Sequence, residues 1–193
     1  MTPAEGGPRR VEPRRRDRGR DEAFVRRALA VLPWGTLALG DPGGGPPHVN
    51  TNLFVHVGDP DRLYLHTART GALADAVRGA GAEGAPATFT AATMGRLLPA
   101  AEALEFSVEY AGVTATGRIV EITDDDEATA GLQAILDRYA PHLRPGRDYR
   151  EIVADELKRT AVFRLDVEAW SGKQKSVDEH DGAFRLDVPA PPL

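Results

Sequence analysis

The sequence predicts a mainly β protein: a small antiparallel barrel of about six strands with α-helices at its margins. Short runs of alternating apolar residues recur along the chain, and turns rich in glycine and proline, such as "GDPGGGPP" (40–47), separate them. Segments with helical periodicity lie before, between and after these runs. No GxGxxG motif follows a first strand, which argues against a doubly wound dinucleotide-binding fold.

The first third of the chain predicts one helix and three strands. Asp21 is a candidate N-cap for a helix that runs to about Leu32, where Pro33 ends it. The apolar positions of this helix share one face (Phe24, Val25, Ala28, Leu29 and Leu32). Strands are expected at 34–39, 48–57 and 63–66. Because short turns join them, we expect the three strands to form an antiparallel meander.

The rest of the chain alternates helices and strands. Thr70 is a candidate N-cap for a helix over 70–79. The stretch "DDDEATAGLQAILDRYAPHL" (124–143) predicts an amphipathic helix with an acidic first turn, and a short helix is expected at about 149–158. The remaining strands are expected at 85–93, 104–122 and 159–173, the second of them either one long strand or two joined at a glycine.

The two ends of the chain differ in composition from its middle. Residues 1–20 hold seven arginines against three acidic residues, although the whole chain carries a net charge of −5. We expect a disordered arginine-rich tail over 1–20, one domain over 21–175 and an exposed C-terminal tail over 176–193. A basic arm can also bind nucleic acid, but no aromatic residue interleaves these arginines, so a nucleic-acid partner is not expected.

Composition excludes several kinds of chemistry. The chain has no cysteine, so disulfides, thiolate nucleophiles and cysteine-based metal sites are impossible. Its five histidines lack the HxxH or HExxH spacing of a metal site, so no metal is expected. No apolar run approaches the length of a membrane span, and no signal-peptide core follows the basic N-terminus. We therefore expect a cytoplasmic protein.

The stretch "LYLHTARTGALADAV" (63–77) joins a strand directly to a helix. Free backbone N–H groups at a helix N-terminus favour an anion such as phosphate. Thr67 and Thr70 add hydroxyl donors, Arg69 adds a fork of donors, and Gly71 permits a ligand to approach the backbone closely. A threonine cap and a glycine at a strand-to-helix turn also need no ligand, so both interpretations stay open.

The order of motifs along residues 21–175 resembles the FMN-binding split-barrel superfamily, which includes pyridoxamine 5'-phosphate oxidase. The motifs are "LYLHTARTG", "ATFTA", "LEFSVEYAGVTATGRI", "GLQAILDRYAPHL" and "LKRTAVFRLDVEAWSGK", and the chain is most similar to the 5-nitroimidazole reductase branch. The resemblance implies an antiparallel split β-barrel, a homodimer, and FMN in a groove at the dimer interface. The chain departs from the pattern of this branch at Ala72 and Leu73, where many relatives have a basic residue, and at Gly112, where many have serine.

The resemblance also implies the roles of individual residues. Asn50, Thr51 and Asn52 would line the isoalloxazine. The segment His66, Thr67, Ala68 and Arg69 would lie against the ribityl and phosphate groups, next to Gly71. Trp170 and Lys173 would approach the cofactor from the other subunit, and His66 would also be the catalytic residue, close to the flavin and the substrate.

These inferences predict an FMN-dependent oxidoreductase that reduces a small-molecule acceptor, such as a nitroaromatic of the 5-nitroimidazole type. The flavin would carry the redox chemistry, and His66 would orient the acceptor or donate a proton. The alternative is a flavin-, deazaflavin- or haem-binding protein of the same fold without efficient turnover. For haem, His66 would be the candidate axial ligand.

Overall fold

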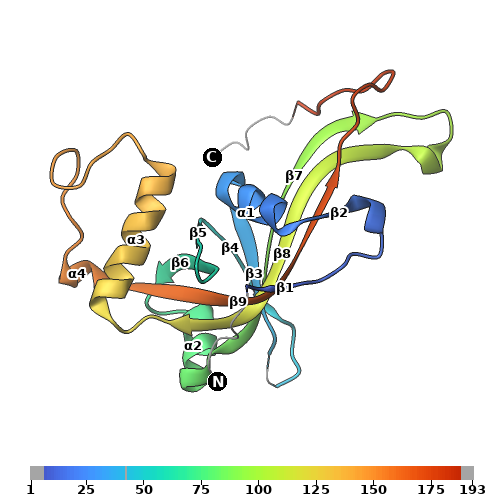
Figure 1. Ribbon diagram of the computed structural model, residues 1–193. Coiled ribbons are helices and arrows are strands. Elements are labelled where there is room, and N and C mark those ends of the chain that lie inside the picture. The colour runs from blue at the N-terminus through green and yellow to red at the C-terminus, as the bar shows by residue number, and fades with distance from the viewer. Residues whose placement is uncertain (1–6, 42, 188–193) are drawn as a thin grey trace.

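The computed structural model describes residues 7–41 and 43–187. These residues form one mainly antiparallel, nine-stranded sheet with helices at its margins (Figure 1), which confirms the predicted fold class. The strands are β1 (Arg9–Arg10), β2 (Gly19–Arg20), β3 (Gly35–Leu39), β4 (His48–Asn52), β5 (Val55–Val57), β6 (Arg62–Ala68), β7 (Ala85–Leu98), β8 (Ser107–Glu121) and β9 (Thr160–Lys175). The α-helices are α1 (Glu22–Val31), α2 (Ala72–Gly79), α3 (Asp125–Tyr139) and α4 (Ala154–Leu157).

The sheet curls into an open barrel because consecutive pieces of chain supply both of its edges. The strand order is β4-β3-β7-β8-β9-β6-β5. β4 and β5 therefore stand at opposite edges, although only Leu53 and Phe54 separate them in the sequence. The two edges have to approach each other at this point. No ladder joins β4 to β5 within the described ranges, so the barrel remains split.

The expected meander over 34–66 is wrong in its middle strand. β3 pairs with β4 and β5 pairs with β6, but residues 48–57 divide into two strands. The chain leaves one edge at Phe54, which is completely buried. Arg138 of α3 donates to the Phe54 carbonyl at 2.8 Å, and the Tyr139 hydroxyl accepts from the Phe54 N–H at 3.2 Å. These contacts fix the backbone at the point where the chain passes from β4 to β5. Helix α3, which is distant in the sequence, therefore determines where the predicted strand is divided.

The barrel encloses the main hydrophobic core, and α3 covers a second one on the outside. Inward-facing side chains from most strands meet helices α1 and α2 in the first cluster. Its largest fully buried members are Trp170, Phe54, Phe89 and Phe163. The second cluster lies between α3, α4 and the outer faces of β5, β6 and β9, and includes Tyr64, Ile135, Leu157 and Val162. The side chains of β6 and β9 are therefore held by one hydrophobic cluster on each face of the sheet.

The N-terminal segment is paired with the barrel rather than free. β6 pairs with β9 only as far as Asp166, which leaves the later part of β9 without a neighbour on that side. β1 pairs with Ala169 and Trp170, and β2 pairs with Gly172 and Lys173. Over residues 7–20 the structure thus differs from the expected disordered tail, because an open strand edge offers unpaired backbone groups to any nearby segment. Residues 1–6 of the expected tail lie outside the described residues.

The segment after β9 lies along the outer half of the β7–β8 hairpin, which reaches away from the barrel (Figure 1). Arg96 of β7 pairs with Glu109 of β8 at 2.8 Å, and Glu109 also accepts the Val177 N–H at 3.0 Å. The hydrogen bonds from Arg96 and Val177 hold the pKa of Glu109 well below its usual range. Residues 176–187 are mostly exposed, residues 188–193 lie outside the described residues, and the boundary of the predicted tail stays a prediction.

Replacing Arg96 with glutamine should loosen this C-terminal segment. The variant removes the cation that orients Glu109, the acceptor of the Val177 N–H, and it also removes the guanidinium that donates to the Val177 carbonyl. We expect the Val177 amide to exchange hydrogen faster than in the wild type, while amides of the barrel core do not change. Arg185→Gln, an exposed arginine of the same segment, is the control. Equal exchange at Val177 in all three proteins would contradict the role of Arg96.

Candidate functional site

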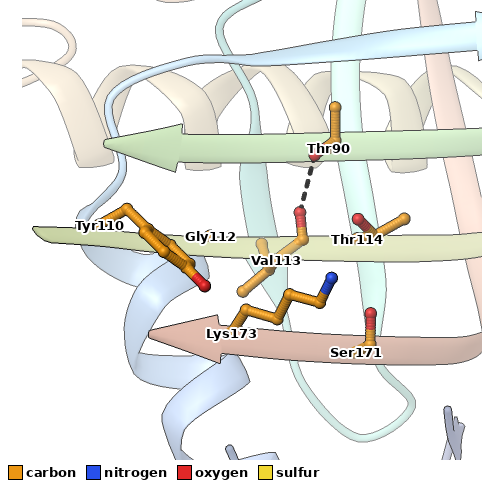
Figure 2. A pocket seen from close by; sticks show the side chains of 7 residues that line it. All are labelled: Thr90, Tyr110, Gly112, Val113, Thr114, Ser171 and Lys173. Carbon is orange, nitrogen blue, oxygen red and sulfur yellow. Dashed lines mark hydrogen bonds between the residues drawn. The ribbon is translucent and has the colours of Figure 1, made fainter. Parts of the chain in front are cut away.

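A polar hollow of about 200 Å³ lies on the outer face of β7, β8 and β9. The strand register places Thr114 opposite both Thr90 and Ser171, and Gly112 opposite Lys173, so these positions share one side of the sheet. Figure 2 shows Tyr110, Thr114, Ser171 and Lys173 projecting from that side. The hollow is lined by Thr90, Tyr110, Gly112, Val113, Thr114, Ser171 and Lys173. Hydroxyl groups and one ammonium group suit a polar, anionic ligand.

An apolar hollow of about 350 Å³ lies between α3, α4 and the outer faces of β6 and β9, at the other end of β9. His66 faces it because it shares a strand face with Tyr64, which belongs to the second hydrophobic cluster. The walls are Leu132, Ile135, Leu136 and Ile152, with Glu156, Arg159 and Thr160 as polar lining.

Burial decides the charge of His66. Desolvation lowers the pKa of its imidazole from 6.5, which leaves the ring neutral near pH 7. Its Nδ1 atom is buried and has no hydrogen-bond partner among the described residues. A buried polar atom without a partner is rare in native proteins and calls for a ligand, a water or an ion beside it. The histidine therefore lines the apolar hollow and has one buried ring nitrogen without a partner.

His66 should make the folded state less stable as the pH falls. Because its pKa is lower in the folded than in the unfolded state, the unfolded state takes up the proton first below about pH 6.5. The free energy of unfolding should therefore decline on acidification through this window and stay level above it. Urea midpoints of the wild type and His66→Gln, compared on both sides of pH 6.5, test this. Equal pH dependence in the two proteins would contradict it.

The turn after β6 differs from the phosphate-binding turn that the sequence predicts at residues 66–71. Gly71, with φ of 133°, is the N-cap of α2 and makes no side-chain cap, so the predicted Thr70 cap is wrong. Glycine adopts this conformation without the steric cost that threonine would bear. Arg69 donates to the Leu157 carbonyl at 2.6 Å, and the Thr67 hydroxyl donates to the Ala68 carbonyl at 3.0 Å. The Thr67 hydroxyl is therefore already used as a donor, and Arg69 is tied to the Leu157 carbonyl through one of its guanidinium N–H groups.

The predicted isoalloxazine residues lie on two faces of β4. Thr51 faces outward beside Thr36, with 3.1 Å between the two hydroxyl oxygens. Asn50 and Asn52 pair with Leu37 and Gly35, so their side chains face the inner side of the sheet. The Nδ2 atom of Asn52 is buried and lacks a partner within the described part of the chain.

Residues 6–174 match the family described as pyridoxamine 5'-phosphate oxidase. The match covers most of the chain. The chain belongs to the pyridoxamine 5'-phosphate oxidase family. This confirms the resemblance that the sequence motifs carry. No curated protein matches the chain.

Several solved structures share the fold of this family member. A flavocytochrome, Anf3, from Azotobacter vinelandii is 24% identical with a TM-score of 0.72, covering 94% of this chain and 86% of that one. An FAD and haem binding protein from Mycobacterium smegmatis is 25% identical with a TM-score of 0.69, covering 90% and 88%. A candidate 5-nitroimidazole antibiotic resistance protein from Bacteroides thetaiotaomicron is 18% identical with a TM-score of 0.62, covering 80% and 84%.

In this family member Trp170 is a core residue rather than a surface one. Its side chain is 1% exposed inside the barrel, and the guanidinium of Arg26 lies 4.9 Å from its ring centroid. Its predicted contact with a cofactor would need the core to open. Lys173, the other residue predicted to approach from a second subunit, is exposed and lines the polar hollow.

The predicted site residues of one copy do not form a single site. Val162, the partner of His66 on β9, and Lys173 are separated by about 35 Å of extended strand. Both His66 and Lys173 face the outside of the barrel, but at opposite ends of β9. No single small ligand reaches both within one copy, which is the geometry expected if two copies complete the site.

Sequence reasoning missed a buried ionic cluster beside Trp170. Asp61 accepts from Arg26 of α1 at 2.7 Å and contacts His56 Nε2 of β5 at 2.7 Å. Burial alone would raise the pKa of Asp61, but the hydrogen bonds from Arg26 and His56 outweigh it and lower the pKa. No local motif marks these residues, because they come from a helix, a strand and a turn. The polar hollow was missed for the same reason.

Two kinds of feature are absent from residues 7–41 and 43–187. None of the helices there combines the length and the apolar character that crossing a bilayer requires. Nor do three or more histidine and acidic side chains gather there into a potential metal site.

Proposed function

We propose that this protein is a flavin-dependent redox protein that binds FMN between two copies of the chain and reduces a small acceptor such as a nitroaromatic. The observation that carries the proposal is the pair of unlike hollows at opposite ends of β9, one polar with Lys173 and one apolar with His66. Family membership and the flavin-binding descriptions of the similar structures support it.

The residues of the polar hollow fit the polar part of a flavin. Thr90, Thr114, Ser171 and Tyr110 offer hydroxyl groups for a ribityl chain, and Lys173 offers a cation for a phosphate. When bound, the flavin supplies electron transfer, for which no side chain of this chain can substitute. The protein supplies the position of the flavin and the electrostatics around it.

His66 would act on the acceptor from the apolar hollow. The surrounding leucine and isoleucine side chains make much of the lining apolar, and desolvation favours the neutral imidazole. A neutral imidazole can orient an acceptor through one nitrogen or donate a proton from it.

The first experiment is the visible absorption spectrum of the purified protein, with the released cofactor identified by mass. FMN released from a dimer would support the proposal, and acceptor screens with reduced protein would follow. A deazaflavin mass would keep the fold and change the chemistry. A colourless protein that takes up no added flavin would overturn the proposal.

Haem binding without efficient turnover is the second candidate function. The observation that favours it is that His66 lines an apolar hollow, since a neutral imidazole beside an apolar space suits an axial ligand of haem iron. Two of the similar structures are a flavocytochrome and an FAD and haem binding protein. A haem band in the same spectrum that disappears in His66→Ala would establish this candidate. Its absence after haem is added would remove it.

A further inference from the structure

Arg159 is the cationic side chain in the lining of the apolar hollow that also contains His66. The backbone of Arg159 is bonded on both sides, because its N–H donates to the Glu156 carbonyl at 3.0 Å and its carbonyl accepts the Arg69 N–H at 2.9 Å. The residue lies at the junction between α4 and β9, directly before Thr160, and it is exposed. The guanidinium therefore extends from an anchored point at the rim of the hollow.

No side chain of the described part of the protein neutralises Arg159. The two acidic residues of α4 pair with other cations: Glu156 with Arg150 at 2.9 Å, and Asp155 with Lys158 at 2.7 Å. Within residues 7–41 and 43–187, no carboxylate lies within ion-pair distance of the Arg159 guanidinium. This cation is therefore available to a ligand.

Glu156, the carboxylate in the lining, is engaged through both of its oxygens. Its Oε1 atom accepts from Arg150 at 2.9 Å, and its Oε2 atom accepts the Val153 N–H at 3.1 Å. His66 adds no charge near pH 7, because desolvation lowers the pKa of its imidazole. An anion that enters the hollow therefore meets an unmatched cation, whereas a cationic ligand meets no unmatched carboxylate.

The register of β6 and β9 places the rim with Arg159 about one aromatic ring away from His66. His66 lies opposite Val162 in the ladder between the two strands, and Thr160 is two residues before Val162 on the same face. His66 and Thr160 are therefore diagonal neighbours, which lie about 7–8 Å apart. The hollow, at about 350 Å³, is at the lower end of the range for small-molecule pockets. Its size and span suit a single substituted ring.

We propose that the apolar hollow takes aromatic acceptors that carry a carboxylate, with Arg159 binding the carboxylate and the other end of the ring beside His66. The proposal rests on the proposed redox function, and it names the substrate class: a small aromatic carboxylate with a reducible substituent such as a nitro group. A guanidinium can bind a carboxylate through two parallel N–H···O bonds. The leucine and isoleucine side chains of the lining pack against the ring. The charge at one end of the ring therefore selects the substrate.

The test compares 4-nitrobenzoate with 4-nitrobenzamide, which has the same ring and nitro group but no charge. Binding of each compound to the purified protein in its oxidised form is measured by isothermal titration calorimetry, at low and at raised NaCl. Arg159→Gln removes the cation, and Arg159→Lys keeps the charge but loses the paired N–H donors. Arg27→Gln, at an exposed position of α1, alters the net charge equally and is the control.

We expect the wild type and the control to bind 4-nitrobenzoate about fivefold more tightly than 4-nitrobenzamide. Arg159→Gln should remove this preference and leave the affinity for 4-nitrobenzamide unchanged, and Arg159→Lys should restore part of it. Raised NaCl should weaken the binding of 4-nitrobenzoate only. In the reduced, flavin-loaded protein, Arg159→Gln should raise the KM for 4-nitrobenzoate about fivefold with kcat unchanged, because the guanidinium holds the end of the ring away from the nitro group.

The outcomes separate this inference from the proposed function. Equal affinities for the two compounds in the wild type, no binding of either, or an Arg159→Gln variant that keeps the preference would overturn the inference and leave the flavin function standing. A protein that selects 4-nitrobenzoate through Arg159 but takes up no flavin would overturn the redox role of the hollow and the proposed function together.

Discussion

Replacing Trp170 with alanine is expected to lower the free energy of unfolding by about 3–5 kcal/mol. The indole fills the barrel core at 1% exposure and carries the Arg26 guanidinium over its ring. Truncation leaves a large cavity and removes the apolar neighbour of the cluster formed by Arg26, His56 and Asp61. Urea unfolding followed by far-UV circular dichroism measures the change.

Trp34→Ala is the matched control, because Trp34 is 60% exposed and its removal opens no cavity. We expect it to change stability by no more than a few tenths of a kcal/mol. Trp170→Phe should fall between the two variants. If Trp170→Ala were as stable as Trp34→Ala and lost only its flavin, the core position of Trp170 would be contradicted and its predicted cofactor contact restored.

Replacing His66 with alanine should reduce acceptor reduction by at least about 100-fold while the fold is retained. The side chain lines the apolar hollow, and it is the imidazole through which this hollow could orient or protonate an acceptor. The measurement is the rate at which the flavin-loaded, reduced variant is reoxidised by a nitroaromatic under anaerobic conditions.

His142→Ala is the control for His66, because His142 is an exposed histidine in the loop after α3. It should leave both the flavin content and the rate unchanged. Turnover in His66→Ala equal to that of the wild type would reject a catalytic role. Loss of the cofactor itself from His66→Ala, with a haem band in the wild type, would instead assign His66 to haem ligation.

Most elements of this fold could be predicted from local pattern. α1 begins after Asp21, whose side chain accepts the Phe24 N–H, and it ends before Pro33. α3 has the predicted acidic first turn, and Asp124 caps it. β8 is a single strand in which Gly117 sits at an irregularity of the register. These features depend on residues close in sequence, so a local reading can find them.

The order of strands could not be predicted in the same way. Alternation runs through residues 48–57 on both sides of Phe54, so the pattern alone gave no reason to divide the strand. The division depends on the burial of Phe54 and on its bonds to Arg138 and Tyr139, about 85 residues away in the chain. The pairing of β1 and β2 with β9 likewise depends on where β6 ends.

The candidate site likewise has features that continuous motifs predict and features that they do not. The family, the barrel class and the importance of the segment around His66 could be read from ordered motifs, because each motif is a continuous run of residues. The positions of FMN, of a second copy and of the protein in the cytoplasm stay predictions. The core position of Trp170 was not predicted, since "WSGK" is compatible with a buried or an exposed indole.

The sequence by itself determined most of the segments that become strands and helices, which side chains are apolar enough to form the barrel core, and which family this chain belongs to. Only the tertiary structure decided that His66 and Lys173 face outward at opposite ends of β9, and that Gly19 of the arginine-rich segment pairs with Lys173. The physical reason is that periodicity and capping act over a few residues. Strand order, burial and the distance between two charges arise when segments far apart in the chain pack together.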